Sequence, residues 1–252
     1  MAFSLIKASD LILVDHKGEV IDGGECRLLN TAAYMIHHAV HEARPDVMCA
    51  AHSHSIYGRT FCSLGRKLDT ITQDSCAFHN DLALYESFNG VVLAEEEGKD
   101  IAKALGGQKA ALLQNHGLLT VGKTIEEAVF WFVSLEKCCH SQLMADAAVA
   151  GRGGATVKIG EEEAMYTRKT VGSTMAGTSA LLCKTLYGTL TTSRLLLSEA
   201  TLRCHPQGNW WRLLGVSARA GEIRGATKRA WTDRSSVALW ETDCSSYTVR
   251  SF

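Results

Sequence analysis

Two histidines separated by one residue are the part of this sequence best suited to carry chemistry. His52 and His54 lie at the end of the apolar run 47–51, which is typical of a short buried strand. Alternate residues of a strand project to the same side, so this spacing would direct both imidazoles toward one point. Three neutral imidazoles on zinc leave a position open for water or a substrate oxygen. The pair therefore predicts a metal site at the end of that strand.

His116 is the natural third ligand. It lies in Gln114-Asn-His-Gly117, between two predicted strands at 109–114 and 118–121. A turn that contains glycine can expose a side chain at the edge of a sheet, where it would meet the first two imidazoles. Its neighbour Asn115 is a candidate for holding one of the ring nitrogens. The alternative is that all three are ordinary surface or core histidines, because a single His-x-His pair also arises by chance.

A second group of histidines competes with the first. His37, His38 and His41 lie on the helix predicted for residues 28–43, and two of them, four residues apart, share one of its faces. The spacing is similar to that of the His-Glu-x-x-His zinc motif. However, position 38 holds a histidine where the motif requires the glutamate that acts as general base. We therefore interpret this group as a partly solvated helix face.

Strand and helix patterns alternate irregularly around these residues. The strand patterns include a hairpin with a glycine in its turn, and the long helix pattern opens with the capping box Thr124-Ile-Glu-Glu127. Such alternation favours an α/β fold with three layers around a mixed sheet. The further strands are expected at residues 10–15, 19–22, 70–72 and 82–87, and the further helices at 55–64, 95–105 and 124–150.

Composition excludes several classes of protein. The 252 residues are 46% hydrophobic and 21% charged and include only 2 prolines, which excludes a chain that is disordered throughout. The net charge of -1 produces no field that would draw the chain to nucleic acid or to an anionic membrane. No run approaches the roughly 18 apolar residues that span a bilayer. The 9 cysteines lack any Cys-x-x-Cys spacing, and no export signal is evident, so we expect free thiols in a reducing cytoplasm.

The ordered set of motifs resembles the class II aldolase/adducin domain family. The resemblance runs from about residue 3 to residue 177, and the stretch that ends at Tyr85-Glu86 is similar to the fungal-type branch of the family. The motifs that carry it are Arg44-Pro-Asp46, the segment 51–55 with its two histidines, the segment 114–119 with the third, and the strand end and helix start at 121–128.

The resemblance implies a three-layer α/β/α sandwich and a metal-dependent lyase, which we expect to be cytoplasmic because no export signal is evident. Zn²⁺ or another divalent metal would be held by His52, His54 and His116. It would stabilise an enediolate while a carbon–carbon bond of a small hydroxy-carbonyl, sugar-like compound breaks or forms. The resemblance also implies a homo-oligomer, typically a tetramer with active sites between subunits. Adducins share the fold without the metal, so the alternatives are a non-catalytic domain that associates with the actin cytoskeleton or a truncated inactive product.

The catalytic acid or base is not assigned by this resemblance. In the aldolases it is a glutamate on the helix upstream of the histidine pair, and counting back from Arg44-Pro-Asp46 places that position at Ala33, which cannot transfer a proton. Tyr34, Glu42 and Glu86 are candidates to replace it. We also expect the chain to lack the usual N-terminal segment that holds the substrate phosphate.

The C-terminal part of the chain differs in charge from the rest. Residues 181–252 carry a net charge of +5 and four of the 5 tryptophans, whereas residues 1–180 carry a net charge of -6. We expect residues 1–180 to form the aldolase/adducin-like domain, and the basic tail to be poorly ordered or foreign to it. A nucleic-acid or membrane surface is the less favoured alternative, because no recognisable binding module accompanies the charge.

Limited proteolysis tests this boundary. We predict that a protease added to the full chain leaves a stable core that ends near residue 180, because an unpacked tail exposes its backbone to cleavage. Mass spectrometry of the fragments locates the end. A tail that resists cleavage as well as the core does would be an integrated part of the fold.

Overall fold

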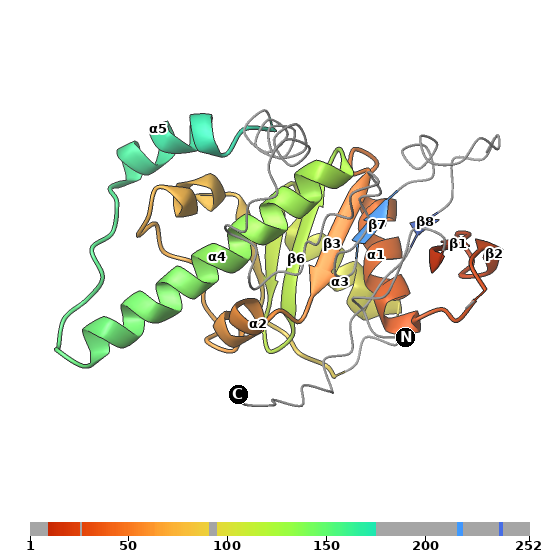
Figure 1. Ribbon diagram of the computed structural model, residues 1–252, viewed down its shortest axis with the longest axis horizontal. Helices are drawn as coiled ribbons and strands as arrows, with labels where there is room; N and C mark the ends of the chain where they lie inside the picture. Colours follow the sequence, from red (N-terminus) through yellow and green to blue (C-terminus); the bar gives the residue numbers. More distant parts are fainter. Residues whose placement is uncertain (1–9, 26, 91–94, 175–215, 219–236, 239–252) are drawn as a thin grey trace, which may run out of the picture.

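The computed structural model describes residues 10–25, 27–90 and 95–174, together with the backbone of two short strands at 216–218 and 237–238 (Figure 1). At the centre lies a five-stranded sheet in which only the first pair of neighbours is parallel, so the sheet is mixed. Its strands, in spatial order, are β4 (Leu82–Tyr85), β5 (Ala110–Leu113), β6 (Gly117–Gly122), β3 (Cys49–Ser53) and β7 (Val216–Ala218).

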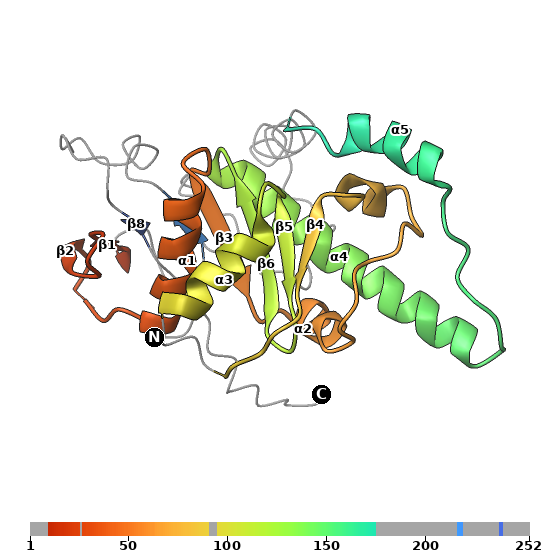
Figure 2. The ribbon, with the colours of Figure 1, turned by 180° about the vertical axis from the view of Figure 1, so that it is seen from behind.

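Helices cover both faces of this sheet, as Figures 1 and 2 show from opposite sides. One face carries α1 (Thr31–Ala43) and α3 (Glu95–Leu105). The other carries α2 (Ile56–Cys62), the short 3₁₀ helix η3 (Asp74–Phe78) and the long α4 (Ile125–Ala150). A further helix, α5 (Glu161–Val171), packs on η3. The expected three-layer α/β/α arrangement is confirmed.

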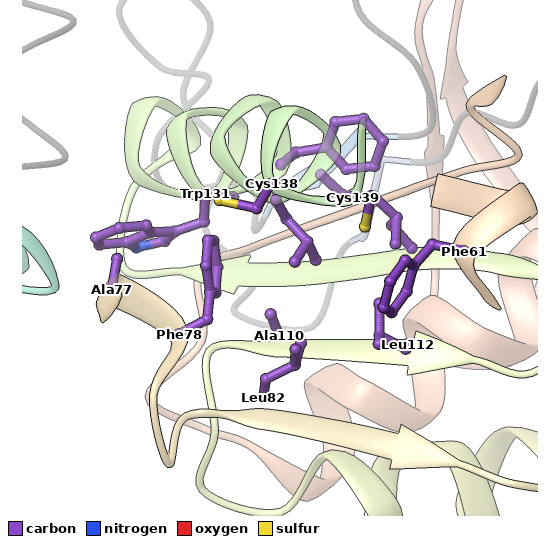
Figure 3. Close-up of a cluster of buried hydrophobic side chains, with 14 of the residues drawn as sticks. Phe61, Ala77, Phe78, Leu82, Ala110, Leu112, Trp131, Cys138 and Cys139 are labelled. Carbon is purple, nitrogen blue, oxygen red and sulfur yellow. The ribbon is translucent and has the colours of Figure 1, made fainter. Parts of the chain in front are cut away.

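The strands are apolar at nearly every position because both faces of the sheet are buried. In β5, Ala110 and Leu112 point into the core beneath α2 and α4, and Ala111 and Leu113 point into the core beneath α1 and α3. Each leucine that is fully buried in this way contributes about 1.5–3 kcal/mol. Figure 3 shows the first of these cores, in which Trp131 packs edge-on against the aromatic ring of η3.

The capping box predicted for the start of α4 is present. Thr124 accepts a hydrogen bond from the backbone N–H of Glu127 at 3.1 Å. The carboxylate of Glu127 accepts in return from the backbone N–H of Lys123 at 2.7 Å. The first bond satisfies an N–H donor of the first turn that has no partner inside the helix. The second bond reaches the residue before the N-cap, one position earlier than in the usual capping box, and the two together start α4 directly after β6 ends.

The predicted hairpin is confirmed as β1 (Ile12–Val14) and β2 (Val20–Gly23). Gly18 in its turn has φ +82°, a conformation that glycine adopts without steric cost. Together with β8 (Val237–Ala238) the hairpin forms a small second sheet in the order β2-β1-β8. This sheet packs beside α1 through the ring of Tyr34.

The strand predicted at residues 70–72 is wrong. These residues are irregular and lead into η3. Thr72 and Ser75 exchange hydrogen bonds between side chain and backbone, which stabilise a turn in place of a ladder. The β-branched residues of the segment favour a strand, but the local polar bonds decide its conformation. Helix α5 was not expected from the sequence.

The predicted tail lies mostly outside the described residues, so its boundary near residue 180 stays a prediction. Two short pieces of it are described: β7 pairs antiparallel with Cys49–Ala51 of β3, and β8 pairs antiparallel with Leu13 and Val14 of β1. In this arrangement the tail contributes the edge strand of each sheet.

The cysteines and the helices of the described residues bear on two expectations from the composition. The five cysteines within the described residues are buried and form no disulfide there: Cys49, Cys62, Cys76, Cys138 and Cys139. Among the helices described, none combines the length and the apolar character needed to cross a membrane.

The contact between α1 and α3 gives a test of the packing. A Cβ atom on Gly98 would lie 2.5 Å from the carbonyl oxygen of Met35 and 3.3 Å from the Cβ of Ala39. We therefore predict that Gly98→Ala lowers the free energy of unfolding by about 1–3 kcal/mol through overpacking, although alanine gains about 1 kcal/mol in helix propensity. Urea unfolding measures the change, with the exposed Lys103→Ala as control. A more stable Gly98→Ala protein would contradict this packing.

Candidate metal centre

The structure brings the three predicted ligand residues together at one edge of the sheet. The ring centroids lie 5.2 Å apart for His52 and His54, 4.8 Å for His52 and His116, and 4.7 Å for His54 and His116. One potential ligand atom from each residue lies within 4.8 Å of the others. Residues 62 positions apart in the chain thus share one site.

Pairing between β3 and β6 places these rings. Ser53 lies opposite Leu118 in the antiparallel ladder, which leaves His54 just beyond the end of β3 and Gly117 beside it. A Cβ on Gly117 would lie 2.4 Å from the carbonyl oxygen of Ser53, so only glycine permits this approach. Asn115, with φ +57°, turns the chain sharply between β5 and β6. The expected exposed turn is present and carries the third imidazole.

His52 is oriented by the backbone of the neighbouring strand. Its ring is fully buried, and its Nδ1 atom lies 2.9 Å from the carbonyl oxygen of Leu118. A carbonyl only accepts, so Nδ1 carries the proton and Nε2 carries the lone pair. The Nε2 atom is buried and has no hydrogen-bond partner among the described residues. The group that holds this ring is therefore a main-chain carbonyl, and not the side chain of Asn115.

Burial keeps the imidazoles of His52 and His116 neutral. It lowers the pKa of His52 well below 6.5, and the neighbouring His116 and His54 lower it further. The pKa of His116 is lowered to about 4, by burial first and then by His54. A metal binds only the neutral form of imidazole. Protons therefore reduce the metal affinity of the site very little near neutral pH.

The donor set fits a divalent cation. A buried nitrogen lone pair without a hydrogen-bond donor is costly, and coordination of a cation between three imidazoles would satisfy it. Three nitrogen ligands suit zinc, and they suit iron, cobalt and nickel in the divalent state nearly as well. Within the described part of the chain, no other three histidine, cysteine or acidic residues lie close enough to hold a metal.

The interpretation of the competing histidine group as a partly solvated helix face is wrong for His37 and His41, whereas His38 is half-buried. His37 is fully buried and His41 is 5% exposed, because the sheet and α3 cover this side of α1. The pKa of His37 is lowered to about 3, by burial first and then by His41. The Nδ1 atom of His41 lies 3.3 Å from the carbonyl oxygen of Val47. These two rings are core residues.

No contact between the histidine site and any of the candidate acids or bases is found among the described residues. Ala33 is fully buried in α1. The hydroxyl of Tyr34 donates to the carbonyl oxygen of Asp15 at 3.4 Å, which ties it to the hairpin. Glu42 and Glu86 are exposed. Their part in catalysis stays a prediction.

Sequence reasoning did not single out Glu136, which lies close to the histidine pair. This half-buried residue of α4 accepts hydrogen bonds from the side chain of Ser55 at 2.5 Å and from the backbone N–H groups of Gly58 at 2.8 Å and Tyr57 at 3.1 Å. The sequence signal is slight: a carboxylate between the apolar positions Leu135 and Cys138 of a long helix.

Residues 1–143 match the model of the class II aldolase and adducin N-terminal domain. The chain belongs to this family. The resemblance inferred from the histidine motifs is therefore confirmed, and so is the fold that it implied.

Several proteins are similar to this chain. The decarboxylase NovR of Streptomyces niveus is 46% identical over 69% of the chain, and the 4-hydroxy-3-prenylphenylpyruvate oxygenase/4-hydroxy-3-prenylbenzoate synthase of Streptomyces roseochromogenus subsp. oscitans is 47% identical over the same share. The chain spans 63% and 61% of their lengths, less than two thirds. The solved L-fuculose 1-phosphate aldolase of Glaciozyma antarctica is 47% identical with a TM-score of 0.65, over 75% of this chain and 73% of that one. Adducins are more distant: mouse alpha-adducin is 33% identical over 60% of this chain and 20% of its own.

The buried histidines predict how stability depends on pH. The folded-state pKa is about 3 for His37 and about 4 for His116, whereas the ordinary value is 6.5. At a pH between the folded-state value and the ordinary one, the unfolded chain binds protons that the folded chain excludes. The free energy of unfolding of the metal-free protein should therefore fall by about 1.4 kcal/mol per pH unit for each such histidine as the pH drops below that ordinary value. Urea unfolding with a chelator, from neutral pH to about pH 5, measures the slope. His37→Gln should reduce it, and an unchanged slope in this variant would contradict the assignment.

Proposed function

We propose that this protein is a metal-dependent lyase of the class II aldolase type. It would break or form a carbon–carbon bond next to the carbonyl group of a small, sugar-like hydroxy-carbonyl compound. The observation that carries the proposal is the convergence of His52, His54 and His116, with the buried Nε2 of His52 directed at no hydrogen-bond donor among the described residues. A purely structural cluster of neutral imidazoles would leave this lone pair unsatisfied.

The similar proteins support a lyase because their named activities share one chemical need. Aldol cleavage and decarboxylation both leave an electron pair on the carbon next to a carbonyl group. A cation at the carbonyl oxygen stabilises that pair. The aldolase and the decarboxylase named above are both nearly half identical to this chain. The oxygenase among the similar proteins leaves the choice of metal open between zinc and a redox-active ion, and we propose zinc.

Each ligand residue has a defined task in this mechanism. A bound divalent cation would supply Lewis acidity to substrate oxygens. His52, His54 and His116 would hold it. The carbonyl of Leu118 would keep Nε2 of His52 as the coordinating atom, and burial keeps His52 and His116 neutral.

Proton transfer requires a group other than Ala33, and we propose that the site is completed in a homo-oligomer. Tyr34, Glu42 and Glu86 remain the candidate acids or bases. Two of them, the glutamates, are exposed and can therefore face a second copy of the chain. A tetramer with active sites between subunits, as the family resemblance implies, would accommodate this arrangement.

An adducin-like, non-catalytic domain is the alternative proposal, and the loss of an acid at Ala33 favours it. Its partner would be the actin cytoskeleton. Three convergent imidazoles argue against it, because an interaction surface has no need of the buried lone pair on His52.

Metal content separates the two proposals. We predict that the purified protein, supplied with zinc, binds about one ion per chain. His52→Ala and His116→Ala should lose it, whereas the exposed His16→Ala should keep it. Inductively coupled plasma mass spectrometry measures the metal, and circular dichroism confirms the fold. A folded wild-type protein without metal would contradict the lyase proposal and support the adducin-like one.

Substrate chemistry is tested by hydrogen exchange at carbon. The metal-loaded protein should exchange the protons next to the carbonyl group of dihydroxyacetone, or cleave unphosphorylated L-fuculose, as followed by nuclear magnetic resonance in deuterium oxide. His52→Ala should reduce the rate to that of the buffer. Metal binding without exchange or cleavage on either compound would argue against this substrate class.

A further inference from the structure

The chain segment that follows the histidine pair is clamped to helix α4. Glu136 accepts three hydrogen bonds from this segment: from Oγ of Ser55 at 2.5 Å, from N–H of Gly58 at 2.8 Å and from N–H of Tyr57 at 3.1 Å. One turn later on α4, His140 stacks face to face on the ring of Tyr57, with centroids 3.6 Å apart and planes inclined by 6°. We call this group of five residues the α2–α4 clamp.

The clamp is built from bonds that the segment cannot make by itself. The first backbone N–H groups of a helix have no partner inside the helix, and α2 begins with no side-chain cap of its own. A carboxylate from α4 therefore takes the place of the cap, and hydrogen bonds to a charged acceptor are stronger than those between neutral groups. Glu136 is only half-buried, so solvent weakens each of its hydrogen bonds. The strength of the clamp therefore comes from the number of donors that the carboxylate holds.

His54 lies between two fixed points. On its N-terminal side, Ser53 is the last residue of β3 and is paired with Leu118. On its C-terminal side, Ser55 is held by the carboxylate of Glu136. The ring itself packs close to Gly117, where an added Cβ would lie 3.3 Å from its Cδ2 atom. The ladder thus orients one end of this residue and the clamp orients the other.

We propose that Glu136 is a positioning residue of the metal centre: through Ser55 it fixes the backbone of His54, and so raises the affinity of the three histidines for a divalent cation. This inference rests on the proposed function, in which those histidines hold a cation. His52 is oriented by a strand carbonyl, whereas the backbone of His54 lies beyond the ladder, next to a serine that a different layer of the fold holds.

An isosteric substitution gives the sharpest test. In Glu136→Gln the amide group turns one acceptor into a donor, which then faces an N–H or O–H donor of the clamp, while the volume is unchanged. The matched control is Glu127→Gln on the same helix. Glu127 also accepts a backbone hydrogen bond, but it lies against Gly122, at the end of β6 away from the histidines. Five residues of strand, about 17 Å, separate that end from Gly117.

Titration with Co²⁺ probes the site directly, because the visible absorption of the bound ion depends on how its ligands are arranged around it. We expect Glu136→Gln to weaken binding by about 10-fold, the lower end of the range for groups that orient metal ligands, and to change the shape of the spectrum. Ser55→Ala, which keeps the carboxylate charge, should weaken binding less and alter the spectrum in the same direction. Glu127→Gln should lower the melting temperature without affecting either readout.

The outcomes separate the possible errors. If wild type binds no Co²⁺, the proposed function fails, and this inference fails with it. If wild type binds, and Glu136→Gln has the same affinity and spectrum while melting at a lower temperature, Glu136 only caps α2 and the inference is overturned. If affinity falls in Glu136→Gln with an unchanged spectrum, and Ser55→Ala binds as wild type does, the effect is one of charge alone and positioning is again overturned.

Discussion

The pairing of β3 with β6 is the contact on which the rest of the candidate site depends. It places Ser53 opposite Leu118 and brings Gly117 so close to the next strand that any larger residue would collide with a carbonyl oxygen. That approach sets the third imidazole against the first two. The same strand also supplies the carbonyl that orients His52. One ladder therefore both assembles the three candidate ligands and leaves the lone pair of the most buried one on its Nε2 atom.

Burial gives this arrangement its chemical character. The sheet is covered on both faces, so the histidines at its edge have lost most of their water. Desolvation disfavours the charged imidazolium, and each neighbouring ring disfavours it further. The outcome is that His52 and His116 are neutral donors near pH 7, and that the buried Nε2 of His52 has no hydrogen-bond partner among the described residues. The cost of keeping such a set without a cation is the main physical reason to interpret it as a metal centre.

The helices add a second layer of control. Glu136 of α4 holds the segment directly after His54, and the same helix begins at a capping box that follows β6. The long α4 thus contacts both ends of the site's scaffold: the start of α2 beside the ligands, and the far end of the strand that carries Gly117. Rigid support from a neighbouring layer is what a site built at the end of a strand requires.

Much of the fold and of the candidate site could be predicted from local patterns in the sequence. Strand alternation indicated the shared side of His52 and His54, and the glycine after His116 indicated the exposed turn. The capping box marked the start of α4, because the bonds that form it span only a few residues. The same local reasoning failed at residues 70–72, where side-chain hydrogen bonds outweighed β propensity, and at His37 and His41, whose helix face is buried by elements distant in the chain.

What the sequence alone determined was the kind of chemistry: residue types and short-range spacing name the ligands, since both follow from covalent geometry and the period of a strand. The tertiary structure decided which donors meet, how deeply they are buried and which group orients each of them. The carbonyl of Leu118 and the carboxylate of Glu136 carry no motif, because their roles arise only when separate elements pack together. Protonation and ring orientation depend on such packing, and no local pattern encodes it.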